Sequence, residues 1–153
     1  MRTIPLTQGY VAKVDDADYE RATAYKWHAE EMRNGVYAAT SVKGKRVSLH
    51  HFVVGAVRQS DLVDHKNGDG LDCQRGNLRV ATPSQNQWNR KRGANNKSGV
   101  KGVSWNSARR QWVAQICVNY KRIFIGRFDT LDVAVQAYRE AAVKHHGEFA
   151  RFE

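Results

Sequence analysis

The chain has 153 residues, of which 41% are apolar and 10% aromatic, enough for a buried core and too many for wholesale disorder. It contains no run of about 18 apolar residues, which excludes a membrane-spanning helix. Its first residues lack the apolar segment of a secretory signal. The two cysteines are too few for a disulfide scaffold or a thiolate zinc site. We therefore expect a cytoplasmic, non-secreted protein of one ordinary domain or two small ones.

The positive charge is large and unevenly distributed. Lys and Arg number 25 against 15 Asp and Glu, a formal net charge of +10. Residues 1–64 hold nine basic and eight acidic side chains, whereas residues 65–97 hold seven and two, and residues 98–153 hold nine and five. Such an excess on a small protein is typical of polyanion binding. Its position predicts that the middle and C-terminal parts contact the polyanion.

The first 88 residues predict short strands and helices separated by polar turns. Alternating apolar residues predict strands, in chain order, at residues 10–14, 36–42, 46–54, 62–66 and 78–80. Asp16 or Asp18 is expected to cap a helix that continues to about residue 25. Pro83 falls in the first turn of another helix, which ends near Trp88.

The segment 46–54 is ambiguous between a strand and a helix. Leu49, Phe52 and Val53 lie at i, i+3 and i+4, which is the spacing of one helical face. The small core expected for this part of the chain consists of Trp27, Tyr37 and Phe52.

Residues 89–98 separate two differently patterned parts of the chain. They are basic and rich in Gly and Asn, which predicts an interdomain linker and is equally typical of a solvated loop. Alternation then predicts a three-stranded antiparallel meander at residues 102–105, 111–118 and 121–128. Asp129 or Thr130 is expected to cap a helix that ends at Gly147, with small alanines that allow close packing on the sheet.

Polar residues with catalytic potential occur at His50-His51, Asp64-His65, Asn77 and Asn86. Because Asp64 and His65 are neighbours on a predicted strand, their side chains point to opposite faces. Hydrolysis of a phosphodiester needs a water nucleophile, a base and a cation that stabilises the leaving oxygen. Carboxylate and amide oxygens suit Mg²⁺, and an imidazole with a pKa of about 6.5 suits the base.

The spacing of these residues is similar to that of the HNH endonuclease family, in particular its phage and intron-encoded, homing-type branch. The matching segments are Leu49-His50-His51, Val63-Asp64-His65, Asn67-Gly68-Asp69, Leu71-Asp72-Cys73, Asn77-Leu78-Arg79, and Thr82 with Gln85-Asn86. The resemblance covers roughly residues 45–90 and implies a ββα-metal module, a hairpin and a helix that hold one ion. His51 stands where the family has Arg, and Cys73 where it has Asn.

This resemblance also implies a role for each residue. Asp64 and Asn86 would bind one Mg²⁺ or Mn²⁺ ion, and no structural zinc is expected. His65 would be the general base that activates water. Asn77 would hold the loop between the strands and orient His65 through backbone hydrogen bonds. His50 would face the scissile phosphate or support the site.

Residues 98–152 resemble a second family, the Apetala/ethylene-response-factor (AP2/ERF) DNA-binding domain, which also occurs fused to HNH nucleases of phages and mobile elements. The matching segments are Ser98–Trp105, Gln111–Ile116, Ile125–Thr130, Ala134, Ala137-Tyr138, Ala141-Ala142 and His146–Ala150. The resemblance implies a sheet that enters the major groove with a helix packed behind it. Its DNA-facing positions are Lys101, Gly102, Ser104, Asn106, Gln115, Cys117, Arg122 and Phe124.

Several of these positions depart from the plant pattern, so the family's base preference does not carry over. Ser104 and Cys117 stand where the family has Arg, and Gln115 where it has Glu. Basic residues at strand ends and in the linker are expected to contact phosphates: Arg109, Arg110, Lys121, Arg90, Lys91 and Arg92. Core packing is expected of Trp112, Ile116, Ile123 and Tyr138, with Trp105 left open, and a solvated helix end of His145 and His146.

The sequence thus predicts an α+β protein with an HNH nuclease domain at 1–88, a linker at 89–98 and an AP2/ERF-like domain at 99–153. The expected function is site-specific nicking of double-stranded DNA, without a membrane partner or a small-molecule substrate. We expect a monomer, and the sequence leaves a dimer as the alternative oligomeric state. One alternative is a non-catalytic DNA-binding regulator with a decayed nuclease fold. An RNA-binding protein is favoured by charge alone.

Overall fold

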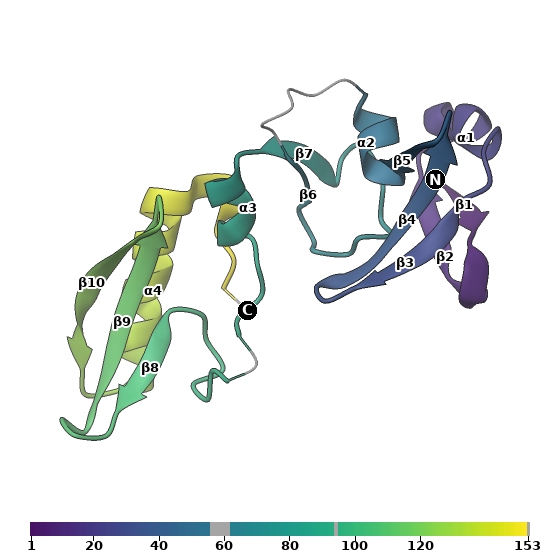
Figure 1. Ribbon diagram of the computed structural model, residues 1–153. Helices are drawn as coiled ribbons and strands as arrows, with labels where there is room; N and C mark the ends of the chain where they lie inside the picture. The colour runs from purple at the N-terminus through teal and green to yellow at the C-terminus, as the bar shows by residue number, and fades with distance from the viewer. Residues whose placement is uncertain (56–61, 94, 153) are drawn as a thin grey trace. The chain divides into compact units, whose positions relative to one another are not determined.

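The computed structural model describes residues 1–55, 62–93 and 95–152, which form two compact units at residues 1–82 and 83–153 (Figure 1). The boundary between the units precedes the helix at residues 83–88, whereas the division expected from the sequence follows it. Each unit has its own hydrophobic core. Among the described residues, no helix has the length and apolar character needed to cross a membrane.

Small antiparallel sheets and short helices build the first unit (Figure 1). The paired strands are β1 (Arg2–Pro5) with β2 (Val11–Val14), β3 (His28–Met32) with β4 (Gly35–Val42) and β5 (Lys45–Ser48), and β6 (Leu62–His65) with β7 (Leu78–Ala81). The helices are α1 (Asp16–Thr23) and α2 (Leu49–Val54), with a 3-10 turn at Thr7–Gly9.

The ambiguous segment 46–54 contains both of the elements that its pattern permits. Its first residues complete β5, and α2 starts at Leu49. The hairpin between β4 and β5 turns through Lys43 and Gly44, both with positive φ, which matches the twist of the flanking strands. Helix α2 therefore begins directly where the sheet ends, and it delivers His50 from a buried position.

Helix α1 does not use the cap that its sequence predicts. Its N-cap residue is Asp15, whose side chain makes no capping hydrogen bond within the helix. Instead, the Asp15 carboxylate accepts hydrogen bonds from the Gln74 side chain at 3.1 Å and the Arg75 backbone N–H at 2.8 Å. Asp18 is buried and pairs with Arg75 and Arg21. The predicted caps, Asp16 and Asp18, are wrong, because the helix begins after Asp15 and these two carboxylates pair with the Met1 amino group and with the two arginines.

The core of the first unit forms around residues from most of its elements. Trp27 is 5% exposed and Phe52 packs against the same cluster, as predicted. The buried members are Ile4, Ala12, Val14, Ala22, Trp27, Ala38, Leu49, Val53, Val63, Cys73 and Leu78. Tyr37 lies outside this cluster and contacts two histidine rings instead. Its prediction as a core residue is therefore wrong.

The second unit is a three-stranded antiparallel sheet with a long helix packed on one face (Figure 1). Its elements are α3 (Pro83–Trp88), β8 (Val103–Asn106), β9 (Gln111–Val118), β10 (Lys121–Phe128), α4 (Leu131–His146) and the 3-10 turn η2 (Gly147–Phe149). Thr130 caps α4 by accepting from the Val133 N–H at 3.4 Å. Gly147 ends the helix with a φ of 52°.

Small residues let α4 lie close on the sheet, as the sequence predicts. The buried core consists of Val103, Ala114, Ile116, Ala134, Tyr138 and Ala142. Ile123 is 40% exposed and is not part of this core, so its prediction is wrong. His146 is 5% exposed rather than solvated, because its ring stacks on Trp88.

Candidate active site and nucleic-acid interface

The β6–β7 hairpin positions Asp64 and His65 at the end of a short strand. The register pairs Asp64 with Arg79 and His65 with Leu78. Both predicted site residues are buried, at 6% and 5% exposure. The Arg79 guanidinium donates from Nε to Asp64 Oδ2 at 2.9 Å, and its terminal nitrogen lies at the same distance from that oxygen. The Asp64 carboxylate is thus oriented by a buried ion pair.

A cluster of aromatic rings surrounds His65. The His50 ring, delivered by α2, lies with its centroid 5.0 Å from that of His65, and His51 lies 4.5 Å from His50. Burial and the neighbouring His65 and His51 lower the pKa of His50 to about 3, so its ring is neutral. His50 Nδ1 has no hydrogen-bond partner among the described residues.

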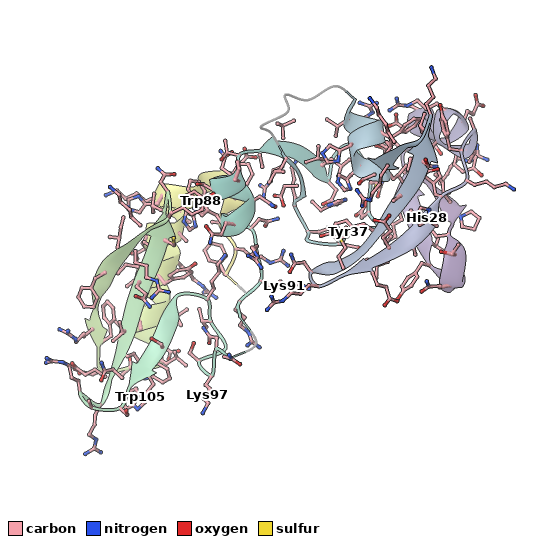
Figure 2. All side chains as sticks on the ribbon, in the orientation of Figure 1. His28, Tyr37, Trp88, Lys91, Lys97 and Trp105 are labelled. Atoms are coloured by element: carbon pink, nitrogen blue, oxygen red, sulfur yellow. The ribbon has the colours of Figure 1, made fainter. Side chains whose placement is uncertain are left out.

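Tyr37 is a site residue that the sequence does not reveal. Its ring centroid, on β4, lies 5.9 Å from that of His50 and 6.0 Å from that of His65. Figure 2 labels Tyr37 on this strand. Burial and the nearby Asp64 charge raise the pKa of its hydroxyl. Tyr37 lies outside the matching segments of the sequence. It belongs to the sheet of β3, β4 and β5, whereas His65 lies on β6.

Cys73 contacts the predicted base directly. Its Sγ lies 3.9 Å from His65 Nε2 and the same distance from the Gly70 carbonyl oxygen. Burial raises the pKa of the Cys73 thiol to about 12, so it stays protonated. Burial also lowers the pKa of His65, while Asp64, Asp69 and Asp72 oppose that shift. Cys73, which stands where the HNH pattern has Asn, therefore contacts the His65 ring as well as the backbone of the loop.

Asn77 ties together the loop between β6 and β7. Its side-chain Nδ2 donates to the Asp72 carbonyl at 2.8 Å and to Asn67 Oδ1 at 3.1 Å. Its Oδ1 accepts from the Asn67 N–H at 3.0 Å, and its carbonyl accepts from the Lys66 N–H at 2.9 Å. The loop therefore has a fixed shape directly after His65.

The N-terminal strands support the same loop from outside. The Lys13 N–H donates to the Leu71 carbonyl at 2.8 Å, and the Cys73 N–H donates to the Lys13 carbonyl at 2.9 Å. Together with the ion pair between Asp18 and Arg75, these bonds attach residues 71–75 to β2 and α1. The N-terminal segment is thus part of the scaffold of the candidate site.

The donor set predicted for a metal ion consists of Asp64 on β6 and Asn86 on α3. One carboxylate and one amide oxygen fit a hard cation such as Mg²⁺, which keeps several water ligands. Within the described ranges, no cluster of three or more His, Cys, Asp and Glu side chains has the arrangement of a metal site. Asp64 belongs to the first unit and Asn86 to the second, so an ion shared by these two donors stays a prediction.

The outer face of the second unit's sheet presents a row of exposed polar and aromatic side chains. The register places Gln115 opposite Phe124 and Cys117 opposite Arg122. A bulge between Phe124 and Gly126 shifts the alternation of β10, so that Arg127 pairs with Val113. The Arg127 guanidinium carbon lies 5.2 Å from the Phe124 ring centre.

Arg127 is thus a candidate DNA contact that the sequence pattern does not predict. Strict alternation from Phe124 assigns residue 127 to the opposite face. Ser104, Arg122 and Phe124 are exposed, as their predicted role requires, with Phe124 at 56%.

The remaining predicted contacts lie at turns or in the basic segment. Exposed side chains are found at Arg109, Arg110, Lys121, Arg90, Lys91 and Arg92. Asn106 Oδ1 accepts from the Arg109 N–H at 3.0 Å, which fixes the β8–β9 turn. Lys101 differs from these residues, because its ammonium group donates to the carbonyls of Trp88 and Arg90 at 2.5 and 2.8 Å.

Two viral proteins are similar to this chain. Protein 3.8 of Escherichia phage T7 is 36% identical over 98 residues, which cover 64% of this chain and 80% of that protein. A protein of Acanthamoeba polyphaga mimivirus, named Uncharacterized HNH endonuclease L560, is 32% identical over 131 residues, or 82% of this chain and 65% of that protein. No family model and no solved structure matches the chain. The chain therefore belongs to the family of phage T7 Protein 3.8.

Proposed function

We propose that the protein is an HNH-type, metal-dependent endonuclease that hydrolyses a phosphodiester in double-stranded DNA. The observation that carries this proposal is the buried His65, held at the end of β6 beside Asp64 and against a loop tied by Asn77. A histidine fixed in this way suits a general base. The HNH name of the mimivirus relative and the basic charge of the chain agree with DNA as the substrate.

Each residue has a separate task in the proposed reaction. His65 accepts the proton of the attacking water, and Asn77 keeps the loop beside it in shape. Asp64 and Asn86 would hold one Mg²⁺ or Mn²⁺ ion, which stabilises charge on the leaving oxygen when bound. Arg79 orients the Asp64 carboxylate through their ion pair. The neutral ring of His50 packs edge-on to His65 and limits its rotation.

We further propose that the second unit binds DNA with the outer face of its sheet, in the manner of the AP2/ERF domain that it resembles. A twisted antiparallel sheet fits the major groove. Gln115, Arg122 and Phe124 lie on the outer face of this sheet. Arg127 lies on the same face, with its guanidinium group over the Phe124 ring. Exposed arginines and lysines at the turns suit phosphates.

One base and one ion attack one strand per encounter, so the proposed product is a nick. A double-strand break then requires a dimer or a second event. Site-specific nicking is typical of homing-type enzymes of phages and mobile elements, which is the biological role that we propose.

Supercoiled plasmid that contains the target site tests this function. With Mg²⁺ or Mn²⁺, we expect relaxed circles from the parent protein and at least a 100-fold loss of nicking in His65→Ala. The matched control is His28→Ala, because His28 is an exposed histidine on β3 of the same unit, labelled in Figure 2. Supercoils that persist with every metal and with target DNA contradict the proposal.

The second candidate is a DNA-binding regulator without catalysis. The observation that favours it is the buried pairing of Asp64 with Arg79, since a carboxylate that already has a guanidinium partner binds a cation less readily. For a regulator, Asp64→Asn and His65→Ala leave duplex affinity unchanged, and the parent protein does not cleave.

A further inference from the structure

A cavity of about 220 Å³ lies in the second unit at the edge of its sheet. Strand β8 begins at Val103, and the Gln115 N–H donates to Gly102 just before it, so β9 continues past this end of β8. The cavity opens there. The residues that matter for its chemistry are Trp88, Lys101, Gln115, Arg122, Tyr138 and His146. Figure 2 labels Trp88 at the end of α3.

Two aromatic rings form one wall of this cavity. The Trp88 indole and the His146 imidazole are stacked, with centroids 4.5 Å apart and planes within 11°. His146 Nε2 lies 2.8 Å from the Cys117 carbonyl oxygen, which only accepts, so Nε2 carries the proton. Burial lowers the pKa of His146, which favours the neutral ring. His146 Nδ1 is therefore an acceptor.

The wall offers a donor and an acceptor that lack partners. Neither Trp88 Nε1 nor His146 Nδ1 has a hydrogen-bond partner within the described part of the chain, and His146 is 95% buried, being 5% exposed. Unpaired buried polar groups cost about 1–3 kcal/mol each, which makes them uncommon. Both nitrogens are enclosed, so a flat ligand with an acceptor and a donor reaches them only when the neighbouring side chains move aside.

Two cationic side chains also line the cavity. Lys101 is half-buried, and burial with the charges of Arg151 and Arg90 lowers its pKa to about 8. Arg122 lines the cavity from the exposed face of β10. An anionic group at this position is stabilised by both Lys101 and Arg122.

We propose that this cavity binds a single nucleotide, with its base against the stacked rings of Trp88 and His146 and its phosphate at Lys101 and Arg122. A nucleobase is flat and carries donors and acceptors on one edge. The nucleotide comes either from solution or from a DNA strand, extruded from the stack. This binding requires no phosphodiester cleavage, and so it stands apart from the nuclease proposal.

The first experiment titrates the full-length, ¹⁵N-labelled protein with each deoxynucleoside monophosphate. We expect saturable shifts of the Gly102, Gln115 and Cys117 amides, and weaker binding of the nucleosides without phosphate. Arg122→Gln should weaken nucleotide binding about tenfold, because it removes a charged hydrogen bond. Lys144→Gln, which removes an exposed charge from α4 of the same unit, is the matched control and should bind like the parent.

The second experiment distinguishes the two sources of the nucleotide. A mixed-sequence duplex with 2-aminopurine at successive positions is saturated with full-length protein, and fluorescence rises where a base leaves the stack. A rise assigns the site to a nucleotide of the strand, whereas monophosphate binding without a rise assigns it to a free nucleotide. Absence of both signals, or equal binding by Arg122→Gln, overturns the proposal. Plasmid nicking reports on the nuclease site separately.

Discussion

At the scale of single residues, Asp18 is a buried charge of the first unit's scaffold that pairs with two arginines. It is 1% exposed, and its carboxylate accepts hydrogen bonds from Arg75 Nε at 2.7 Å and from Arg21 Nε at 2.8 Å. The hydrogen bond from Arg75 is the main cause that holds the pKa of Asp18 below its usual range. Asp18 therefore stabilises the folded state as an anion.

We expect Asp18→Asn to lower the free energy of unfolding by about 2 kcal/mol. The loss is moderate because the Arg75 and Arg21 side chains, 54% and 43% exposed, remain solvated when the charge disappears. Asp16→Asn is the control, since that side chain is 72% exposed and should change stability by at most about 0.5 kcal/mol. Urea denaturation at pH 7 measures both variants, and equal stabilities contradict the argument.

The same residue predicts a pH dependence. A depressed folded pKa gives stability that is complete above the unfolded value, about 3.9, and is lost as pH falls through the folded pKa. The difference in stability between the parent and Asp18→Asn should stay constant from pH 7 to about pH 5. Below about pH 4 it should shrink. Urea titrations at pH 7, 5, 4 and 3 follow it.

The two cysteines should differ sharply in reactivity. Cys73 is fully buried and its pKa is raised to about 12, whereas Cys117 is partly exposed. Because the thiolate is the reactive form, iodoacetamide at pH 8 should alkylate Cys117 and leave Cys73 intact. Peptide mass mapping identifies the modified residue. Full alkylation of both in urea is the control, and native labelling of Cys73 contradicts its burial.

At the scale of elements, regular patterning explains which predictions succeeded. Strands β9 and β10 have the bounds that alternation predicts, because one face of each packs on α4 while the other carries the polar and aromatic side chains of the outer face. The sequence does not predict strand β3, because its residues, HAEEM, do not alternate between apolar and polar. This strand lies at the edge of its sheet and pairs only with β4. Pairing with β4 stabilises a segment whose own residues do not favour a strand.

The sequence predicts the segments of the candidate site better than its contacts. Residues 62–66 and 78–80 are correctly predicted as strands, but the placement of Tyr37 and Cys73 against His65 depends on tertiary packing. His146 was expected at a solvated helix end, yet it stacks on Trp88, which lies 58 positions earlier in the chain. Such contacts leave no periodic signal.

The junction between α4 and the β8–β9 sheet depends on Gly102. Its φ is +74°, and an added Cβ would lie 2.1 Å from the Tyr138 ring and 2.6 Å from the Gln115 carbonyl oxygen. Gly99 has a similar φ of +78°, with nothing within 4 Å of an added Cβ. The two glycines share the backbone strain and differ only in the clash.

We therefore expect Gly99→Ala to cost about 1 kcal/mol, and Gly102→Ala about 3 kcal/mol. Thermal unfolding, followed by near-ultraviolet circular dichroism, compares the variants with the parent. Equal losses of stability in the two variants contradict the predicted clash and mean that the Tyr138 ring moves aside without a cost.

At the scale of the whole molecule, the charge is separated between the units. The N-terminal 64 residues are almost neutral, and the excess lies in the remaining chain. For the proposed DNA binding, this separation predicts that exposed basic residues of the second unit supply most of the non-specific affinity, since phosphate contacts release counterions in proportion to their number.

The salt dependence of DNA binding tests that assignment. The logarithm of the affinity should fall linearly with the logarithm of salt concentration, by about 0.9 for each phosphate neutralised. The exposed pair Arg109 and Arg110 lies between β8 and β9, and changing both to Gln should reduce the slope by about 1.8 if each binds one phosphate. Lys26→Gln, an exposed charge in the first unit, should leave the slope unaltered. Fluorescence anisotropy on a labelled duplex between 50 and 200 mM salt measures the three slopes. A larger effect of Lys26→Gln than of the arginine pair would assign the polyanion contact to the first unit instead.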